Sequence, residues 1–244
     1  MIQNILIASV AAVAIFVSAK AIAQKDTESA ASAVTTPVVV ELFTSQSCSS
    51  CPPADRNLSE LAKNKNIIAL ACHVSYWNHL HWKDTQSHEF CDMRQHGYSS
   101  LRGDRRVYTP QMIVNGKHQF VGSHSSKIKQ ALSAAQQAPL KNINITFDNS
   151  GTLNFTLPSL GSGNYRIWAY GYKNQIHQKI PSGENRGLSQ TYSRPVATYD
   201  NLGAWDGTKT SHSFDKPDAQ IDGIAILAQR DGYGEIVAAG KLEF

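Results

Sequence analysis

The feature that most constrains the fold is a pair of cysteines, Cys48 and Cys51, in the stretch Thr-Ser-Gln-Ser-Cys-Ser-Ser-Cys-Pro-Pro-Ala. The apolar run Val38–Phe43 precedes the pair, and a helical pattern over Pro53–Lys63 follows it. This context predicts a buried strand, a tight turn and a helix, with both sulfurs at the helix N-terminus. The spacing allows a small disulfide, and the N–H groups of the helix end favour a cysteine thiolate.

Three interpretations of the Cys48–Cys51 pair fit the sequence. The first is a redox-active dithiol, which the context of a strand followed by a helix favours. The second is half of a zinc site, but the chain has no second C-x-x-C to complete the ligands. The third is a structural disulfide without further chemistry.

The first residues resemble a secretory signal peptide. The apolar stretch Ile5–Val17 is too short to span a bilayer comfortably, and Ala21–Ala23 has the small residues of a cleavage site. No Lys or Arg precedes the stretch, and an uncleaved N-terminal anchor is the alternative. We expect residues 1–23 to be a signal peptide, residues 24–36 a linker, and the protein to be periplasmic or secreted, with no membrane attachment after cleavage.

The composition is that of a folded protein. Apolar residues make up 41% of the 244-residue chain and charged residues 17%, which excludes a highly charged disordered polypeptide. The net charge is +4, but the basic residues are scattered except in the run Arg102–Arg106. We interpret that run as a solvated loop, and no nucleic acid is expected as a partner.

The elements around the cysteine pair predict an α/β domain over residues 37–139. A second apolar run, Ile67–Val74, completes a parallel βαβ unit. Residues 75–108 are polar and aromatic and form an insertion, with a helix around His88–Ser100. A hairpin and a helix with an N-cap in Ser123–Ser126 then end the domain; the elements are Gln111–Val114, His118–Val121 and Lys127–Ala138.

Residues 140–244 follow a different pattern, in which apolar and polar residues alternate and no long helical pattern occurs. This predicts an all-β, sandwich-like domain packed on the first one. A first hairpin has Ile143–Phe147 and Leu153–Leu157 joined by a turn at Asn149–Gly151. The other expected strands are Tyr165–Tyr172, Thr191–Tyr199, Gly223–Gln229 and Glu235–Phe244.

The order of elements resembles the thioredoxin fold, with a strand, C-x-x-C, a helix, a strand, an insertion, Thr-Pro, a β-hairpin and a helix. In that superfamily a cis-proline opens the third core strand and faces the cysteine pair. Thr109 and Pro110 stand at this position, directly before the strand Gln111–Val114. The resemblance implies a cis peptide bond there, whereas the alternative is a trans proline at the start of a strand.

More narrowly, the chain is similar to a bacterial family of secreted thioredoxin-like proteins that is defined only as a domain of unknown function. The family implies a fold but no established reaction, and the similarity covers nearly all of the mature chain. The matching blocks are Glu41–Ser45, Cys48–Asp55, His73–Trp77, Trp82–Asp84, Arg94-Gln95, Tyr108–Met112, Val114–Gly116 and Gly183–Gly187.

The resemblance implies roles for the cysteines and for the Thr-Pro pair. Cys48 is the candidate nucleophile and the more exposed sulfur, and Cys51 would resolve the mixed disulfide. Thr109 and Pro110 would pack over the sulfurs, and their backbone could pair with an extended substrate segment. The expected partners are protein thiols or disulfides.

Glu41 roughly matches the buried acid that assists proton transfer to the deeper cysteine in thioredoxins, although its spacing to Cys48 is one residue longer. A carboxylate in an apolar strand is costly unless it is paired. A structural hydrogen bond or salt bridge, for example to Lys83 or Arg94, is therefore the alternative role for Glu41.

Cys72 and Cys91 depart from the family pattern. One interpretation is a structural disulfide that tethers the insertion and contributes about 3 kcal/mol in the chain-entropy model. The other is a relay that passes electrons to or from Cys48–Cys51. The structural role is favoured because secreted proteins commonly contain such disulfides.

Two further function classes stay open beside thiol–disulfide exchange. Copper or zinc delivery would use Cys48, Cys51 and His73, with further histidines at His79, His81 and His88. Their irregular spacing argues against one preformed site, and a histidine in a buried strand is more often a core residue.

The third class is a non-catalytic envelope interaction module in which the Cys48–Cys51 disulfide only holds a turn. Glu184 and Asn185, flanked by glycines, are expected to form a turn that contacts the other domain. We expect no cofactor; whether the protein is an enzyme, and its oligomeric state, stay open.

Overall fold

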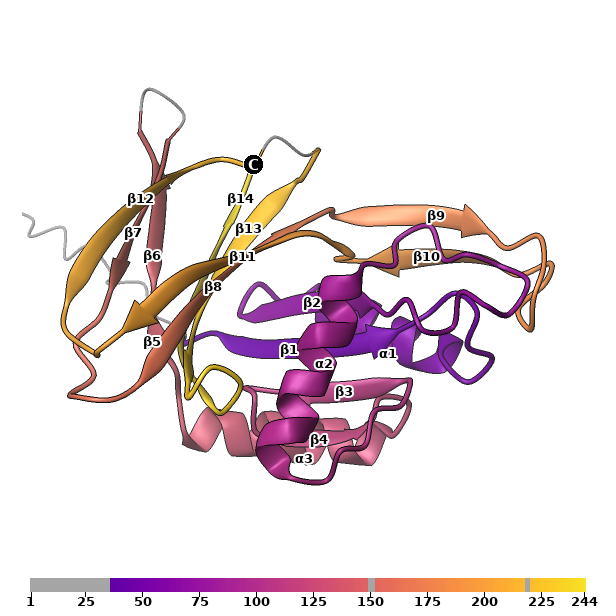
Figure 1. The fold of residues 1–244 in the computed structure, drawn as a ribbon, viewed down its shortest axis with the longest axis horizontal. Helices are drawn as coiled ribbons and strands as arrows, with labels where there is room; N and C mark the ends of the chain where they lie inside the picture. Colours follow the sequence, from indigo (N-terminus) through magenta and orange to yellow (C-terminus); the bar gives the residue numbers. More distant parts are fainter. Residues whose placement is uncertain (1–35, 149–151, 218–219) are drawn as a thin grey trace, which may run out of the picture. The chain divides into compact units, whose positions relative to one another are not determined.

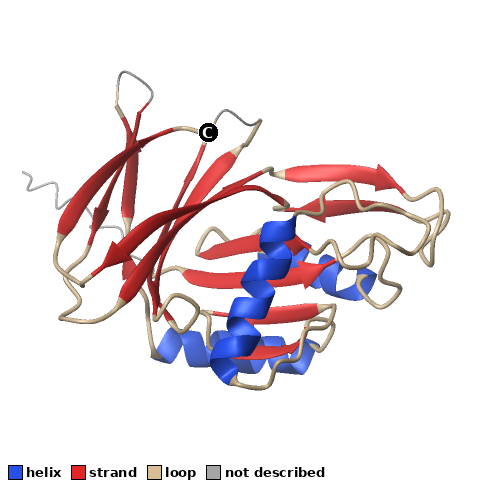
Figure 2. Cartoon of the chain, viewed as in Figure 1, coloured by secondary structure: helices blue, strands red, loops and turns tan. Residues whose placement is uncertain are grey.

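The computed structural model describes residues 36–148, 152–217 and 220–244 (Figures 1 and 2). The expected signal peptide, nearly all of the expected linker and the turn at Asn149–Gly151 lie outside the described residues. The helices are α1 Pro52–Leu61, α2 Glu89–Arg102 and α3 Ser125–Gln137. The strands are β1 Val38–Thr44, β2 Ile67–His73, β3 Gln111–Val114, β4 His118–Val121, β5 Lys141–Asn142, β6 Asn144–Phe147, β7 Thr152–Leu157, β8 Tyr165–Tyr172, β9 Gln175–Lys179, β10 Ser189–Ser193, β11 Val196–Trp205, β12 Thr210–Asp215, β13 Gly223–Arg230 and β14 Ile236–Glu243.

The first sheet has the strand order β2-β1-β3-β4. Strands β1 and β2 are parallel, as the βαβ prediction requires, and β3 runs antiparallel to both β1 and β4. Val40 and Leu42 face α1 and α3, whereas Phe43 faces α2. Side chains therefore alternate between two covered faces, and Figure 1 shows α2 crossing the sheet.

Two helix starts differ from the sequence predictions. Helix α1 begins at Pro52, with Cys51 as its N-cap, one residue before the predicted Pro53. Proline is tolerated in the first turn, where its missing N–H has no intrahelical partner. The N-cap of α3 is His124, which lies within the predicted range Ser123–Ser126 but makes no side-chain capping bond, and the helix begins at Ser125 rather than Lys127.

Two further sheets pack over one hydrophobic core. The five-stranded sheet has the order β11-β8-β13-β14-β5, and the three-stranded sheet has the order β12-β7-β6. Ile145 and Phe155 of the small sheet meet Ile167 and Ile226 of the large one in this core. The alternating residues predicted to face inward are thus buried between sheets.

The expected strand Thr191–Tyr199 is two strands, β10 and β11, which separate at Arg194 and Pro195. Proline donates no hydrogen bond, and Arg194 has a positive φ of 56°, so regular pairing stops there. Strand β10 leaves the large sheet and pairs with β9 in a two-stranded sheet. The resulting β9–β10 hairpin extends over the loops that follow β1 and β2 (Figure 1).

Both predicted domains contribute to one hydrophobic cluster. Val39 and Leu70 of the first sheet pack with Trp168, Tyr170 and Leu227 of the five-stranded sheet. The described residues accordingly belong to one compact unit, and a boundary at residues 139 and 140 stays a prediction. In the part of the chain that the structure describes, no helix has the length and apolar character needed to cross a membrane.

Candidate functional site

Cys48 and Cys51 form a disulfide at the N-terminal end of α1. Strand β1 ends at Thr44, and a turn carries the chain from there to Cys51. The Cys51 N–H donates to the Cys48 carbonyl at 3.1 Å, and the Cys51 carbonyl accepts the first helical hydrogen bonds. The Ser50 hydroxyl lies 3.4 Å from Cys48 Sγ. The sulfurs therefore lie beside the partial positive charge of the helix end.

Both cysteines are buried, although Ser49 and Ser50 between them are exposed. Cys48 is 3% exposed and Cys51 is 0% exposed. Cys48 is therefore more exposed than Cys51, as predicted, but the difference is small. Both cysteines are nearly inaccessible to solvent.

The tip of the β9–β10 hairpin lies on the cysteine turn. Asn185 Nδ2 donates to the carbonyl oxygens of Gln46 and Cys48, each at 2.9 Å. The Ser49 N–H donates to Glu184 Oε2 at 3.3 Å. The expected contact of the Glu184–Asn185 turn with the first domain is confirmed, and its target is the C-x-x-C turn.

Thr109 and Pro110 lie at the same end of the sheet as the disulfide. Gln111, the first residue of β3, is paired with Phe43 near the end of β1, so Pro110 and the cysteine turn leave the sheet side by side. The Thr109–Pro110 peptide bond is cis, as predicted. Trp77 Nε1 donates to Thr109 Oγ1 at 2.8 Å, which anchors the insertion next to this bond.

Glu41 lies on the other face of β1 from α1. Its carboxylate accepts hydrogen bonds from the Arg94 guanidinium and the Tyr98 hydroxyl, and all three side chains are buried. The catalytic assignment of Glu41 therefore needs correction, because its neighbours 40 and 42 are the residues that face α1. The salt bridge to Arg94, the alternative considered from the sequence, is confirmed.

Asp55 is the acidic residue in the first turn of α1, and the sequence alone predicted no role for it. It lies on the face of α1 that carries Cys51, because residues four apart share a face and helical side chains point toward the N-terminus. Its two oxygens accept hydrogen bonds from Thr44 Oγ1 and Gln190 Nε2, both at 2.8 Å. Its place in the apolar stripe with Leu58 was the sequence signal that could have identified it.

Burial raises the pKa of Asp55 to about 6, even though the charge of His73 and the hydrogen bonds from Thr44 and Gln190 act in the opposite direction. The nearby negative charge of Asp84 adds to the increase. Asp55 therefore exchanges its proton close to neutral pH. Such a group, in the first turn of the helix that follows the cysteine pair, can both store and accept a proton.

His73 and Asp84 form a buried pair next to Asp55. His73 Nδ1 lies 2.8 Å from Asp84 Oδ2, which also accepts the N–H of Gln46 at 2.7 Å. Burial alone would lower the pKa of His73, but the Asp84 carboxylate outweighs it and holds that pKa above its usual value. The Tyr192 ring packs edge-on against the imidazole, and His73 Nε2 has no hydrogen-bond partner among the described residues.

The raised pKa of Asp55 predicts a pH-dependent stability. Between about pH 4 and pH 6 the unfolded chain has lost this proton while the folded protein still holds it, so stability falls as the pH rises. We expect the free energy of unfolding of Asp55→Asn, relative to the original protein, to increase by about 2 kcal/mol between pH 4 and pH 7. Urea denaturation across this range measures it, and a pH-independent difference would contradict the assignment.

The cysteine pair and the histidines do not form a recognisable metal centre. Within the described ranges, no group of three or more His, Cys, Asp or Glu side chains is arranged to hold a metal ion. The combination of Cys48, Cys51 and His73 considered from the sequence is therefore not assembled as a ligand set. His73 is instead committed to Asp84.

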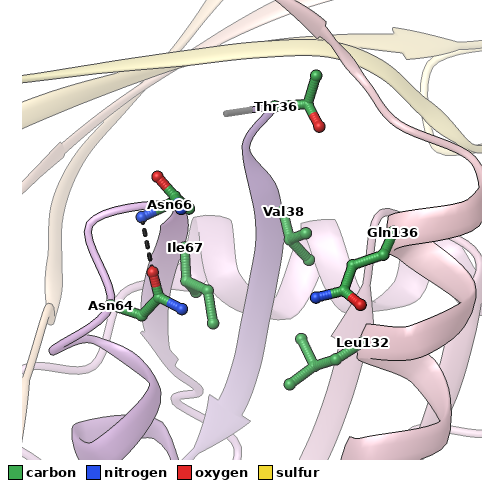
Figure 3. Close-up of a pocket in the computed structure, with 7 residues that line it drawn as sticks. All are labelled: Thr36, Val38, Asn64, Asn66, Ile67, Leu132 and Gln136. Atoms are coloured by element: carbon green, nitrogen blue, oxygen red, sulfur yellow. Dashed lines mark hydrogen bonds between the residues drawn. The ribbon is translucent and has the colours of Figure 1, made fainter. Parts of the chain in front are cut away.

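A cavity of about 260 Å³ lies at the far end of the first sheet (Figure 3). Val38 and Ile67, the first residues of β1 and β2, contribute to its wall, whereas the cysteine turn follows the last residue of β1. Leu132 and Gln136 of α3 complete one side. The lining contains neither an ionisable group nor a nucleophile, so we place the candidate chemistry at the disulfide instead.

Cys72 and Cys91 form a second disulfide, which joins β2 to α2. The expected pairing is confirmed, and both residues are buried with Phe43 and Tyr98. The bond connects the insertion to the central sheet on the face opposite α1. This position fits the tethering role, while the relay role stays untested.

Two solved structures are similar to this protein over most of the chain. A crystal structure of protein AGR_C_4864 from Agrobacterium tumefaciens is similar, with a TM-score of 0.75 and 28% identity over 84% of this chain and 93% of that one. HBP35 of Porphyromonas gingivalis has a TM-score of 0.58 and 14% identity over 86% and 76% of the two chains, a likeness of fold alone. No curated protein matches the chain.

The family model described as "Protein of unknown function (DUF1223)" matches residues 39–229, which include the cysteine turn, the Thr-Pro pair and the β9–β10 hairpin. Because this match spans more than half of the sequence, the chain belongs to the DUF1223 family.

Proposed function

We propose that this protein is a thioredoxin-like thiol–disulfide exchange protein that acts through Cys48 and Cys51. The support from the fold is the β2-β1-β3-β4 order, with α1 and α3 on one face and α2 on the other. This arrangement is similar to that of thioredoxin-like proteins, which carry their cysteine pair at the same point after the first strand.

One observation carries the proposal. The Cys48–Cys51 disulfide lies at the N-terminus of α1, and a buried carboxylic acid with a pKa of about 6 follows one helical turn later. The helix end stabilises a thiolate on Cys48, while Asp55 provides a proton acceptor on the side of Cys51. A disulfide that only holds a turn needs neither group.

The exchange reaction uses these groups in order. In the reduced protein the Cys48 thiolate attacks a substrate disulfide, so that a mixed disulfide forms and one substrate thiolate leaves. The Cys51 thiol then gives its proton to Asp55 and attacks Cys48 Sγ, which releases the second substrate thiolate. The substrate gains two electrons, and the protein ends with the Cys48–Cys51 disulfide.

Thr109 and Pro110 hold the substrate next to the sulfurs in this mechanism. The proline has no N–H and presents an apolar ring, so it adds neither a hydrogen-bond donor nor a charge to the site. The backbone of Thr109 can pair with an extended segment of a protein substrate. Protein thiols or disulfides are therefore the proposed partners.

An oxidising compartment is the proposed location. The cysteines of the chain form two disulfides, Cys48–Cys51 and Cys72–Cys91, and such bonds persist in secreted and periplasmic proteins. This agrees with the signal-peptide pattern at the start of the sequence.

Trapping of mixed disulfides tests the exchange function. Cys51→Ser removes the resolving thiol, so Cys48 should accumulate covalent complexes with disulfide-containing proteins that disappear on reduction. Cys48→Ser is the matched control and should form none, because Cys51 is fully buried. Non-reducing gels and mass spectrometry provide the measurement, and equal trapping by both variants would contradict the proposed roles.

A further inference from the structure

The hairpin tip Ile180–Leu188 makes hydrogen bonds to the C-x-x-C turn. They come from the outer end of the tip, at Glu184 and Asn185. Asn185 alone holds two carbonyl oxygens of the turn, those of Gln46 and Cys48. The Ser182 hydroxyl donates to the His81 carbonyl at 2.6 Å, which fixes the tip to the insertion as well. The tip thus lies against the turn that carries Cys48, although it is remote from that turn in the sequence.

The base of the same hairpin is attached differently. Ile180 is fully buried, and Gln190 of β10 donates a hydrogen bond to the buried Asp55 in the first turn of α1. Gly183 and Gly187 flank the outer end with positive φ angles of 79° and 84°. The base is therefore anchored in the core, whereas the outer end rests on hydrogen bonds at partly exposed positions.

This closed arrangement conflicts with exchange chemistry at Cys48. An attacking thiolate must approach Cys48 Sγ along the axis of the sulfur–sulfur bond, yet Cys48 is 3% exposed. Ser49 and Ser50 reach the solvent, but they carry no sulfur. Some covering segment has to move before a protein substrate can reach the disulfide.

We propose that the hairpin tip Ile180–Leu188 is a lid over Cys48, and that Asn185 is the positioning residue that latches it. The inference rests on the proposed exchange function, because a lid has a purpose only if the disulfide reacts. Release of the two Asn185 hydrogen bonds leaves the turn between residues 46 and 49 held to the tip by the longer bond from Ser49 to Glu184, at 3.3 Å, which breaks as the tip moves away. Strands β9 and β10 stay in place through the buried base.

The rate of reduction of the Cys48–Cys51 disulfide by dithiothreitol tests this lid. Asn185→Ala should accelerate the reduction about tenfold or more, because the closed state loses both latch bonds. Arg186→Ala is the matched control, since Arg186 is an exposed neighbour on the same tip, and its rate should stay within about twofold of the original. Quenched alkylation with peptide mapping assigns the thiols, and an unchanged rate in Asn185→Ala would overturn the lid.

A second variant covers the case in which Asn185→Ala does not fold. Ser182→Ala removes only the contact with His81 and should accelerate reduction severalfold, without a change in melting temperature that exceeds the Arg186→Ala control. No acceleration there would equally overturn the proposal. The reduction potential of the disulfide is measured in parallel, because it reports on the exchange function while the rate reports on the lid.

Discussion

Arg94→Met should lower the free energy of unfolding by about 3–5 kcal/mol, which is the effect expected when one partner of a buried ion pair is removed. Arg94 and Glu41 are both buried, and the guanidinium also binds Tyr98 and Gln229. Without Arg94 the Glu41 carboxylate would keep only one neutral donor, the Tyr98 hydroxyl. Chemical denaturation followed by circular dichroism measures the loss.

Two variants control this prediction. Arg102→Met changes an arginine on the same helix whose ion pair with Asp104 is partly exposed, so it should cost less than about 1 kcal/mol. The double variant Glu41→Leu with Arg94→Met should recover most of the loss, because no uncompensated charge is left buried. If Arg94→Met and Arg102→Met lowered the free energy of unfolding equally, the buried Glu41–Arg94 ion pair would contribute no more to stability than the exposed one, and the prediction would be wrong.

Asp55→Asn should slow the resolution of mixed disulfides by about 100-fold at neutral pH, the order expected when a positioned general base is lost. The asparagine keeps an acceptor for the Thr44 hydroxyl but cannot take the proton of Cys51. In the original protein the rate should rise as the pH passes about 6, where Asp55 ionises. Stopped-flow kinetics on the reduced protein measures both effects.

Glu41→Gln is the comparison that separates the two candidate acids. Its rate, measured at a temperature where circular dichroism shows a folded protein, should stay within about twofold of the original and keep the same pH profile. Glu41 binds Arg94 and Tyr98 on the α2 side of β1, away from α1. A large rate loss in Glu41→Gln together with a normal rate in Asp55→Asn would reverse the assignment.

The strands that could be predicted from the sequence are those with an apolar pattern and a recognisable turn beside them. Gln111–Val114 and His118–Val121 coincide with β3 and β4, because Asn115-Gly116 between them specifies a hairpin. Strands β9 and β12 were not predicted, since Gln-Ile-His-Gln-Lys and Thr-Ser-His-Ser-Phe-Asp lack the alternation of a half-buried strand. Their conformation depends on pairing with β10 and β7.

The candidate site could be predicted only in part. The disulfide and the Thr-Pro pair follow from spacing and order, but the face of β1 to which Glu41 points does not follow from its neighbours alone. Asp55 resembles an ordinary first-turn acid until Gln190, 135 residues later, is seen to bind it. The bond from Asn185 to the Cys48 carbonyl likewise joins residues 137 positions apart, which no local pattern predicts.

The reduction potential of Cys48–Cys51, measured in thiol redox buffers at pH 7 with Cys72–Cys91 intact, tests the exchange function most directly. Exchange predicts a potential between about −270 and −120 mV, the range of proteins that pass disulfides to partners. A potential below about −300 mV, as in structural disulfides, would contradict exchange and leave Cys48–Cys51 as a bond that only holds the turn.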